Sequence, residues 1–407
     1  MAMQEADKVI FDEPLGHTAA GKKPDHSKPS RYSREAILIA CVILLVLLSV
    51  LTAFVTRLYH KKIHTLADQW FAEGEASLQA GNAKEALTDY RNALVYSPDN
   101  TVFQFHLAQA LAAVGRGDQA RSYLLSLLAE SPGSGQINLA LARIAARAGV
   151  VSEAVGDYHR AIFGVWEQDP LLMRWQVQRE LCEYLLDRGA VSQAEPELIA
   201  LADQVPVGDV PRLKTTGALL LRAGMWNRAQ SEYRSVLNVN RHDDDALAGA
   251  GTAAFELGQY TQAAYYLERL SPEKRADPKL ASMLQTAGEI QSANPLQTGI
   301  STTEKAKRTE NAIRQAQSRA QDCAQSQGES LAETRPATEL GKLYATSQQT
   351  QNEWSESNLI RYPDRIDTAM SLVFQMEDAA AQACGSPVTG PDHILLLIQR
   401  SREGGVQ

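Results

Sequence analysis

The sequence predicts an all-α protein with three parts: a single N-terminal transmembrane helix, an α-solenoid of about six helix pairs, and a small C-terminal helical domain. Three observations support this prediction. Residues 36–56 form an uncharged apolar stretch, a pattern of 34 residues recurs between residues 67 and 277, and residues 366–383 place apolar side chains at helical spacing.

The composition is that of a folded protein without a global basic field. Of 407 residues, 44% are hydrophobic and 22% are charged, and the formal net charge is −8. These values exclude a collagen-like or wholly disordered chain. We expect no nucleic-acid partner, because proteins that bind nucleic acid usually carry a basic field. Four cysteines are too few for a disulfide scaffold or a classical zinc domain.

The apolar stretch predicts a membrane anchor. Residues 1–35 are rich in Pro, Gly, Lys and Asp and are predicted to be a disordered tail. Residues 36–56 then run for 21 residues without a charge. An α-helix of about 20 apolar residues crosses a hydrocarbon core of about 30 Å. A cleaved signal peptide has a shorter apolar stretch nearer the N-terminus, so a signal-anchor helix that contacts membrane lipid is favoured.

Basic residues around this stretch predict its orientation. Five precede it and three follow it, namely Lys22, Lys23, Lys28, Arg31 and Arg34 before, and Arg57, Lys61 and Lys62 after. Lys and Arg resist translocation, so the N-terminus is expected in the cytoplasm and the rest of the chain in the periplasm or another extracytoplasmic space. A cytoplasm-facing chain stays open as the alternative.

The repeated pattern is clearest in its first copy, residues 67–100. Large, small, aromatic and proline positions fall there on Trp70, Gly74, Gly81, Ala86, Tyr90, Ala93 and Pro98. This pattern resembles the tetratricopeptide repeat. Later copies keep a glycine at the phase of Gly81, namely Gly115, Gly149, Gly189, Gly224 and Gly258. We therefore expect six repeats over residues 67–277, with an insertion before residue 175. A capping helix is expected over residues 278–294. Each repeat is a pair of antiparallel helices that must stack to bury its apolar face.

The C-terminal third resembles no family. Residues 295–303 are predicted to be a linker and residues 304–407 a small domain of about four helices, over 304–326, 336–359, 366–383 and 389–400. Cys323 and Cys384 lie near the ends of predicted helices. Outside the cytoplasm they could form a disulfide. Two separate buried thiols are the alternative.

No motif in the sequence indicates catalysis. The chain lacks a Gly-Lys-Ser/Thr phosphate loop, a nucleophile elbow and a Cys-x-x-Cys pair. We therefore expect no enzyme, no catalytic residues, no cofactor and no metal site.

The resemblance implies that a concave groove is the binding site for a protein or peptide partner. The family's groove positions fall on eight residues: Phe71, Phe105, Leu139, Arg143, Arg147, Arg179, Lys214 and Arg222. Apolar anchors and Arg side chains suit a peptide or helix with an apolar end and an acidic stretch. Alternatively, the apolar side chains are inter-repeat core and the bases a solvated face.

These expectations combine into one hypothesis of function. The chain is predicted to be a non-enzymatic, membrane-anchored scaffold at a bacterial cell envelope, which binds protein partners through its repeats. The alternative is a cytoplasm-facing, membrane-anchored adaptor or receptor for trafficking or import clients.

Overall fold

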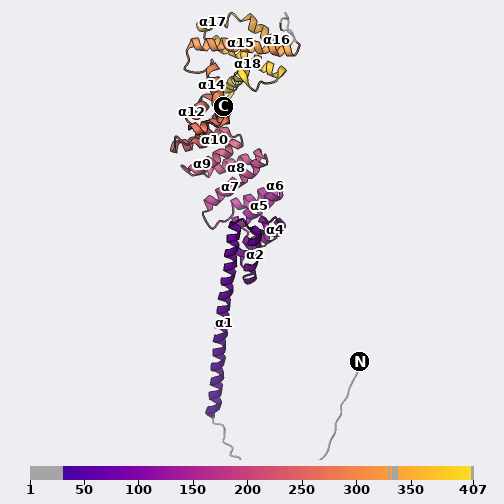
Figure 1. The fold of residues 1–407 in the computed structure, drawn as a ribbon, viewed down its shortest axis with the longest axis vertical. Coiled ribbons are helices and arrows are strands. Elements are labelled where there is room, and N and C mark those ends of the chain that lie inside the picture. Colours follow the sequence, from indigo (N-terminus) through magenta and orange to yellow (C-terminus); the bar gives the residue numbers. More distant parts are fainter. Residues whose placement is uncertain (1–30, 329–330, 332–337, 405–407) are drawn as a thin grey trace, which may run out of the picture. The chain divides into compact units, whose positions relative to one another are not determined.

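The computed structural model describes residues 31–328, 331 and 338–404 (Figure 1). This described part contains nineteen helices and no strand beyond one isolated bridge between Ser134 and Val165. The chain divides into two compact units, Met1–Ala110 and Leu111–Gln407, here called the N-terminal and C-terminal units. The predicted disordered tail lies outside the described residues, apart from residues 31–35, which are helical instead.

The N-terminal unit is dominated by one long helix, α1 (Arg31–Gln79). Its 49 residues correspond to about 74 Å at 1.5 Å per residue. The predicted span, residues 36–56, and the first helix of the first predicted repeat are both part of α1, with no break between them. Large apolar side chains from Ile37 to Tyr59 are 49–66% exposed, whereas Ala67 is buried. The helix therefore changes from an unpacked apolar rod to a packed repeat helix within a few turns.

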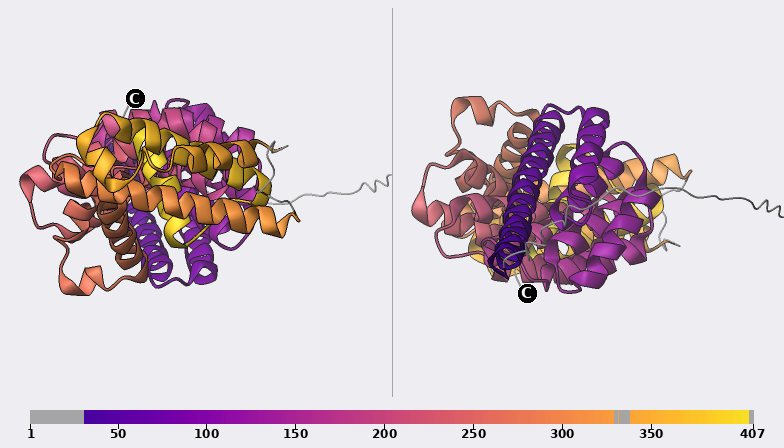
Figure 2. Two further views of the ribbon diagram at one scale, coloured as in Figure 1. Left: turned by 90° about the horizontal axis from the view of Figure 1, so that it is seen from above. Right: turned by 90° about the horizontal axis from the view of Figure 1, so that it is seen from below.

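A second helix, and a third up to Ala110, complete this unit. Helix α2 (Ala83–Tyr96) packs along the end of α1 (Figure 2), and α3 (Thr101–Ala113) follows it. Ala67, Ala93 and Phe103, one from each helix, form a buried cluster. The three helices thus share a small apolar core beyond the exposed part of α1.

The first part of the C-terminal unit is a series of antiparallel helix pairs. The helices are α4 (Gly117–Glu130), α5 (Gly135–Ala148), α6 (Val151–Ile162), α7 (Pro170–Asp187), α8 (Val191–Asp203), α9 (Val210–Arg222), α10 (Trp226–Val239), α11 (Asp244–Glu256), α12 (Tyr260–Leu267), α13 (Pro272–Arg275) and α14 (Pro278–Ala293). The turn glycines that set the sequence period, from Gly115 to Gly258, have φ between 69° and 83°. Only glycine adopts such angles without strain, which explains its recurrence.

The segment between α6 and α7 is held against the turn that precedes α5. The backbone N–H of Gly135 donates to the Val165 carbonyl oxygen at 3.0 Å, and the Val165 N–H donates to the Gly133 carbonyl oxygen at 2.7 Å. Trp166 covers Gly135 and donates from its indole nitrogen to the Ala161 carbonyl oxygen at 2.9 Å. The predicted insertion, residues 169–174, follows this segment and forms the N-cap and first turn of α7 (Pro170–Asp187).

Five helices rather than about four make up the last part of the unit. They are α15 (Thr302–Ser326), α16 (Glu339–Gln349), α17 (Glu356–Arg361), α18 (Arg365–Cys384) and α19 (Gly390–Gly404). The segment predicted as one helix over residues 336–359 is divided between α16 and α17. Helices α15 and α18 lie side by side (Figure 2).

These last helices share a core with the end of the solenoid. Buried Tyr260 of α12 and Ile290 of α14 belong to the same apolar cluster as Ile313, Met370 and Ile398. The linker expected over residues 295–303 is a short turn region between α14 and α15. The C-terminal helices therefore pack directly on the last helix pair and on α14.

Candidate interaction surfaces

The apolar residues predicted to line the groove pack inside the structure. In the N-terminal unit, Phe71 is half-buried and stacks on Phe103, with ring centroids 4.7 Å apart, and Phe105 is 6% exposed. In the C-terminal unit, Leu139 is 7% exposed and belongs to a buried cluster. This burial favours the interpretation that these side chains are inter-repeat core.

The predicted basic residues are engaged with partners from the chain. Arg143 of α5 forms a bidentate pair with Glu180 of α7, with Nε donating to Oε1 at 2.8 Å and Nη2 to Oε2 at 2.7 Å. Tyr158 also donates to Glu180 Oε1, at 2.9 Å. Burial alone would raise the pKa of Glu180, but the hydrogen bond and charge of Arg143 hold it below its usual value. Glu180 therefore stays ionised, and the pair joins two successive first helices.

Ion pairs continue along the following first helices. Arg222 of α9 contacts Asp187 of α7 at 2.6 Å. Lys214 of α9 lies 3.2 Å from Asp243 and 2.7 Å from Asp245 of α11. Asp245 also contacts Lys274 at 3.0 Å. Hydrogen bonds from both lysines lower the pKa of Asp245, and we call this series, with Arg143–Glu180, the ion-pair ladder.

The other two predicted bases have local partners. Arg179 contacts Glu183 on the same helix at 2.6 Å. Arg147 donates to the carbonyl oxygens of Ala112 at 3.0 Å and Arg143 at 3.2 Å. The structure thus brings the bases together with acids that the sequence analysis did not single out. The sequence contains a signal that could have identified these acids: for each base of the ladder, a neighbouring first helix carries an acid.

The C-terminal helices are joined by a covalent bond and a buried ion pair. Cys323 of α15 and Cys384 of α18 form a disulfide, with Cα atoms 5.8 Å apart. Arg319 donates to Glu377 Oε2 at 2.5 Å and to the Gly385 carbonyl oxygen at 3.1 Å. Glu377 is 0% exposed, and burial raises the pKa of its carboxyl to about 7. These contacts fix α15 against α18.

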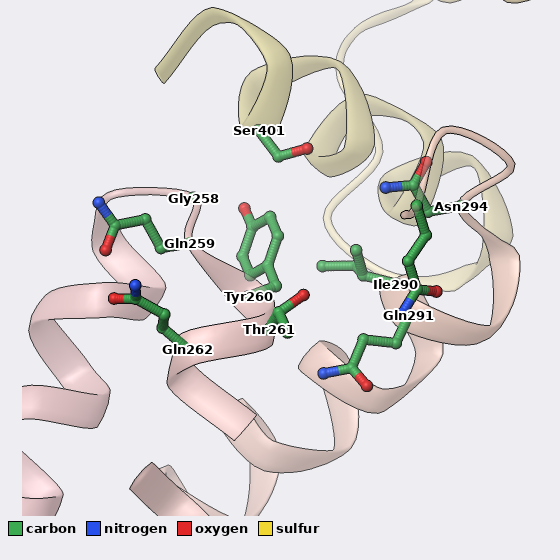
Figure 3. A pocket seen from close by; sticks show the side chains of 10 residues that line it. Gly258, Gln259, Tyr260, Thr261, Gln262, Ile290, Gln291, Asn294 and Ser401 are labelled. Atoms are coloured by element: carbon green, nitrogen blue, oxygen red, sulfur yellow. The ribbon is translucent and has the colours of Figure 1, made fainter. Parts of the chain in front are cut away.

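A polar pocket lies where the last helix pair meets α14 and α19 (Figure 3). Its volume is about 210 Å³. It is lined by Gly258, Gln259, Tyr260, Thr261, Gln262, Ile290, Gln291, Asn294, Gln297 and Ser401. In Figure 3, Asn294 stands across the pocket from Gln259 and Gln262. None of these residues was predicted as a site, because its walls come from segments far apart in the sequence.

The stacked helix pairs and their inter-repeat contacts define the class of protein: an α-solenoid built from helical repeats. The chain contains tetratricopeptide repeats. The tetratricopeptide-repeat family model matches residues 77–144 and 220–287. Proteins of this family are typically scaffolds for interactions between proteins.

Solved structures also match the chain, at low sequence identity. YrrB, a tetratricopeptide-repeat protein described as having an unusual peptide-binding site, is 16% identical over 48% of this chain and 97% of its own, with a TM-score of 0.37. Pseudomonas aeruginosa PilF is 18% identical over 55% of this chain and 97% of its own, with a TM-score of 0.38. No curated protein matches the sequence.

Proposed function

We propose that this protein is a non-enzymatic scaffold, anchored in a bacterial membrane by α1, which presents its repeats to protein partners outside the cytoplasm. The observation that carries the proposal is the continuity of α1. An exposed apolar helix enters the first helix pair without a break. The anchor and the first repeat are therefore mechanically one element.

Exposure of the apolar part of α1 supports insertion in lipid. An 18-residue window of this helix has a mean hydropathy of 3.1 and no buried side chain. A soluble protein rarely leaves so large an apolar surface in water. Residues 36–56 correspond to about 31 Å of helix, which matches the hydrocarbon thickness of a bilayer.

The disulfide between Cys323 and Cys384 supports an extracytoplasmic location. Disulfides persist in oxidising compartments such as the periplasm and are rare in the cytoplasm. The alternative, a cytoplasm-facing adaptor for trafficking or import clients, is favoured by Arg57, Lys61 and Lys62. These three bases follow the apolar stretch, and all three are exposed.

The described ionisable groups support a scaffold rather than an enzyme. Three acids with shifted pKa values, Glu180, Asp245 and Glu377, each contact a base from another helix. Their role is to join helices. We propose that partners bind to the surface of the ion-pair ladder. Charged groups of a partner would replace one member of an ion pair or form a further contact with it.

Two experiments test the proposal. Wild-type protein should stay in the membrane pellet after carbonate extraction, and a variant that lacks residues 36–56 should be released. Release of the wild-type protein would contradict anchoring.

The second experiment concerns the repeats. Arg143→Glu combined with Glu180→Arg keeps an ion pair but reverses its polarity.

This swapped pair should reduce capture of the natural partner in a crosslinking experiment on intact cells. The matched control is the swap of Arg121 and Glu153, which pair at 2.6 Å on the second helices α4 and α6. The control should leave capture unchanged. Equal capture by both swaps would exclude the ladder surface as the contact site.

A further inference from the structure

The segment of α1 that follows the apolar stretch carries bases without acids. Arg57, Lys61 and Lys62 are the charged residues between positions 36 and 67, and all three are exposed. The nearest acid along the helix is Asp68, more than one turn beyond Lys62. The whole chain has a formal net charge of −8. This short segment is therefore a local concentration of positive charge on an acidic protein.

Two of these bases lie on a side of α1 that does not pack against the repeats. Arg57, Lys61 and His64 follow one another at spacings of four and three residues, which places them on one side of a helix. Ala67 and Trp70 pack in the apolar cluster that α1 shares with α2. The other side of α1 carries the partly or fully buried side chains Ile63, Leu66, Ala67 and Trp70. The basic side is therefore open to the surroundings of the helix.

The position of Arg57 and Lys61 along α1 matches the headgroup layer of a bilayer. The hydrocarbon core that residues 36–56 match is about 30 Å thick, and a bilayer with its headgroups is about 40–45 Å thick, which leaves about 5–8 Å on each side. Residues 57–61 extend over about 7.5 Å, because α1 continues through them as one helix (Figure 1). Tyr59, which is 64% exposed, lies between the two bases, at the depth where tyrosine is enriched in membrane proteins. An inserted α1 thus holds both bases in the headgroup layer.

The spacing of Arg57 and Lys61 suits one phosphate group. Side chains four residues apart on a helix have Cβ atoms about 5–6 Å apart, so a guanidinium and an ammonium at such positions reach the same phosphodiester. Both cations can only donate hydrogen bonds, and the charged phosphate oxygens accept them. A lipid with net negative charge is attracted as a whole, whereas the cationic amine of a zwitterionic headgroup cancels much of the attraction. The bases therefore favour anionic phospholipid.

We propose that Arg57 and Lys61 bind the headgroup phosphate of an anionic phospholipid in the leaflet nearest the repeats, and that Lys62 adds to the attraction. This inference rests on the proposed insertion of α1 in the membrane. It holds for either orientation of the chain, since the bases lie at the same depth in both. Because α1 continues into the first helix pair, anionic lipids then gather where the repeats leave the membrane.

Native mass spectrometry of the full chain in neutral detergent micelles measures this preference. Phosphatidylglycerol and phosphatidylcholine with identical acyl chains are added in equal amounts, and the lipid-bound states are compared in about 0.1 M ammonium acetate, where the Debye length is about 10 Å. Each base should contribute about fivefold to the affinity for anionic lipid, which corresponds to about 1 kcal/mol. Arg57→Gln combined with Lys61→Gln should therefore lower phosphatidylglycerol binding by about 25-fold and leave phosphatidylcholine binding unchanged.

Two double variants serve as controls. Lys84→Gln combined with Arg91→Gln removes the same charge from exposed positions of α2, beyond the headgroup layer, and should change the preference by less than about twofold. Arg57→Lys combined with Lys61→Arg keeps both charges and should retain the preference for phosphatidylglycerol.

Three results would overturn the inference. The first is equal binding of both lipids by the wild-type protein. The second is an equal loss of both lipids in the Gln variant, because packing rather than charge would then hold them. The third is competition by inorganic phosphate but not by chloride at equal ionic strength, which would assign the bases to free phosphate.

Carbonate extraction separates this inference from the proposed anchoring. Wild-type protein that stays in the membrane pellet but shows no lipid preference contradicts the phospholipid site alone. Wild-type protein that prefers phosphatidylglycerol in micelles but is released by carbonate contradicts the anchoring and supports the site.

Discussion

Arg319 Nη1 donates to Glu377 Oε2 at 2.5 Å, and the two side chains are 9% and 0% exposed. The second carboxylate oxygen of Glu377 has no partner among the described residues. A buried ion pair with one unsatisfied oxygen costs desolvation free energy, and it fixes the relative position of α15 and α18. The pair lies beside the disulfide that joins the same two helices, because Arg319 also bonds the carbonyl of Gly385, which follows Cys384.

The stability of the protein should depend on pH through Glu377. Burial raises its pKa in the folded state from 4.5 to about 7. The folded state then binds the proton more tightly, so this contribution to the free energy of unfolding is fully present below pH 4.5 and is lost as the pH rises through 7. Glu377→Gln is neutral throughout and should remove a change of about 3 kcal/mol at most between pH 4.5 and 8.

Thermal unfolding at several pH values measures this effect as the difference between wild type and variant. Glu339→Gln, on the exposed face of α16, is the control and should follow the wild-type profile. A constant difference between wild type and Glu377→Gln across this range would show that Glu377 does not titrate there.

Loss of the disulfide should destabilise the C-terminal helices. Cys323 and Cys384 are 61 residues apart, and closing such a loop contributes about 2–4 kcal/mol in the chain-entropy model. The double substitution to Ser, or a reductant, should therefore lower the unfolding midpoint in urea. Cys41→Ala keeps the disulfide and serves as the control. An unchanged midpoint in the double variant would mean that α15 and α18 are held without the bond.

Close helix packing should make two helical glycines respond in opposite ways to Ala. A Cβ at Gly249 would lie 2.3 Å from the ring of Tyr233, so Gly249→Ala should cost about 1–3 kcal/mol. Nothing lies within 4 Å of a Cβ at Gly288, so Gly288→Ala should stabilise the protein by about 0.5–1 kcal/mol. Denaturant unfolding of both variants measures the difference. A neutral Gly249→Ala would refute the close approach of α10 and α11.

The ion-pair ladder should couple neighbouring repeats weakly. A double-mutant cycle with Arg143→Gln and Glu180→Gln should give a coupling of about 0.5–1 kcal/mol, since the pair is bidentate but partly solvated. The coupling should fall at high salt. Additive effects of the two substitutions would mean that the pair does not contribute to stability.

The sequence predicted the helical fold well, because its signals are local. Turn glycines with positive φ recur at a fixed phase, and the apolar stretch is continuous. A proline within a helix does not end it here. Pro196 lies inside α8, which still runs for 13 residues, a length similar to that of its neighbours. Burial of one face of a stacked helix outweighs the loss of a single backbone hydrogen bond.

The candidate sites depend on contacts between segments far apart in the sequence, so they were harder to predict. Arg143 and Lys214 were predicted from their positions within the repeat. Their partners Glu180 and Asp245 belong to the next repeat, which those positions do not indicate. Side chains around the polar pocket come from α12, α19 and the end of α14. Arg308 hydrogen-bonds the Gln297 side chain and the carbonyl oxygens of Gln291 and Asn294, a set of contacts that periodicity does not reveal.

The proposal of a membrane-anchored scaffold outside the cytoplasm is tested most directly by measuring from which side of the membrane its cysteines can be labelled. Cys182 is buried and its thiol pKa is raised to about 12, so after Cys41→Ala the reactive thiols are Cys323 and Cys384. Intact spheroplasts are treated with a membrane-impermeant maleimide, with and without prior reduction. For a membrane-anchored scaffold outside the cytoplasm, we expect labelling of intact spheroplasts only after reduction. Labelling that needs no reductant, and occurs only once the membrane is opened, would place the repeats in the cytoplasm and contradict it.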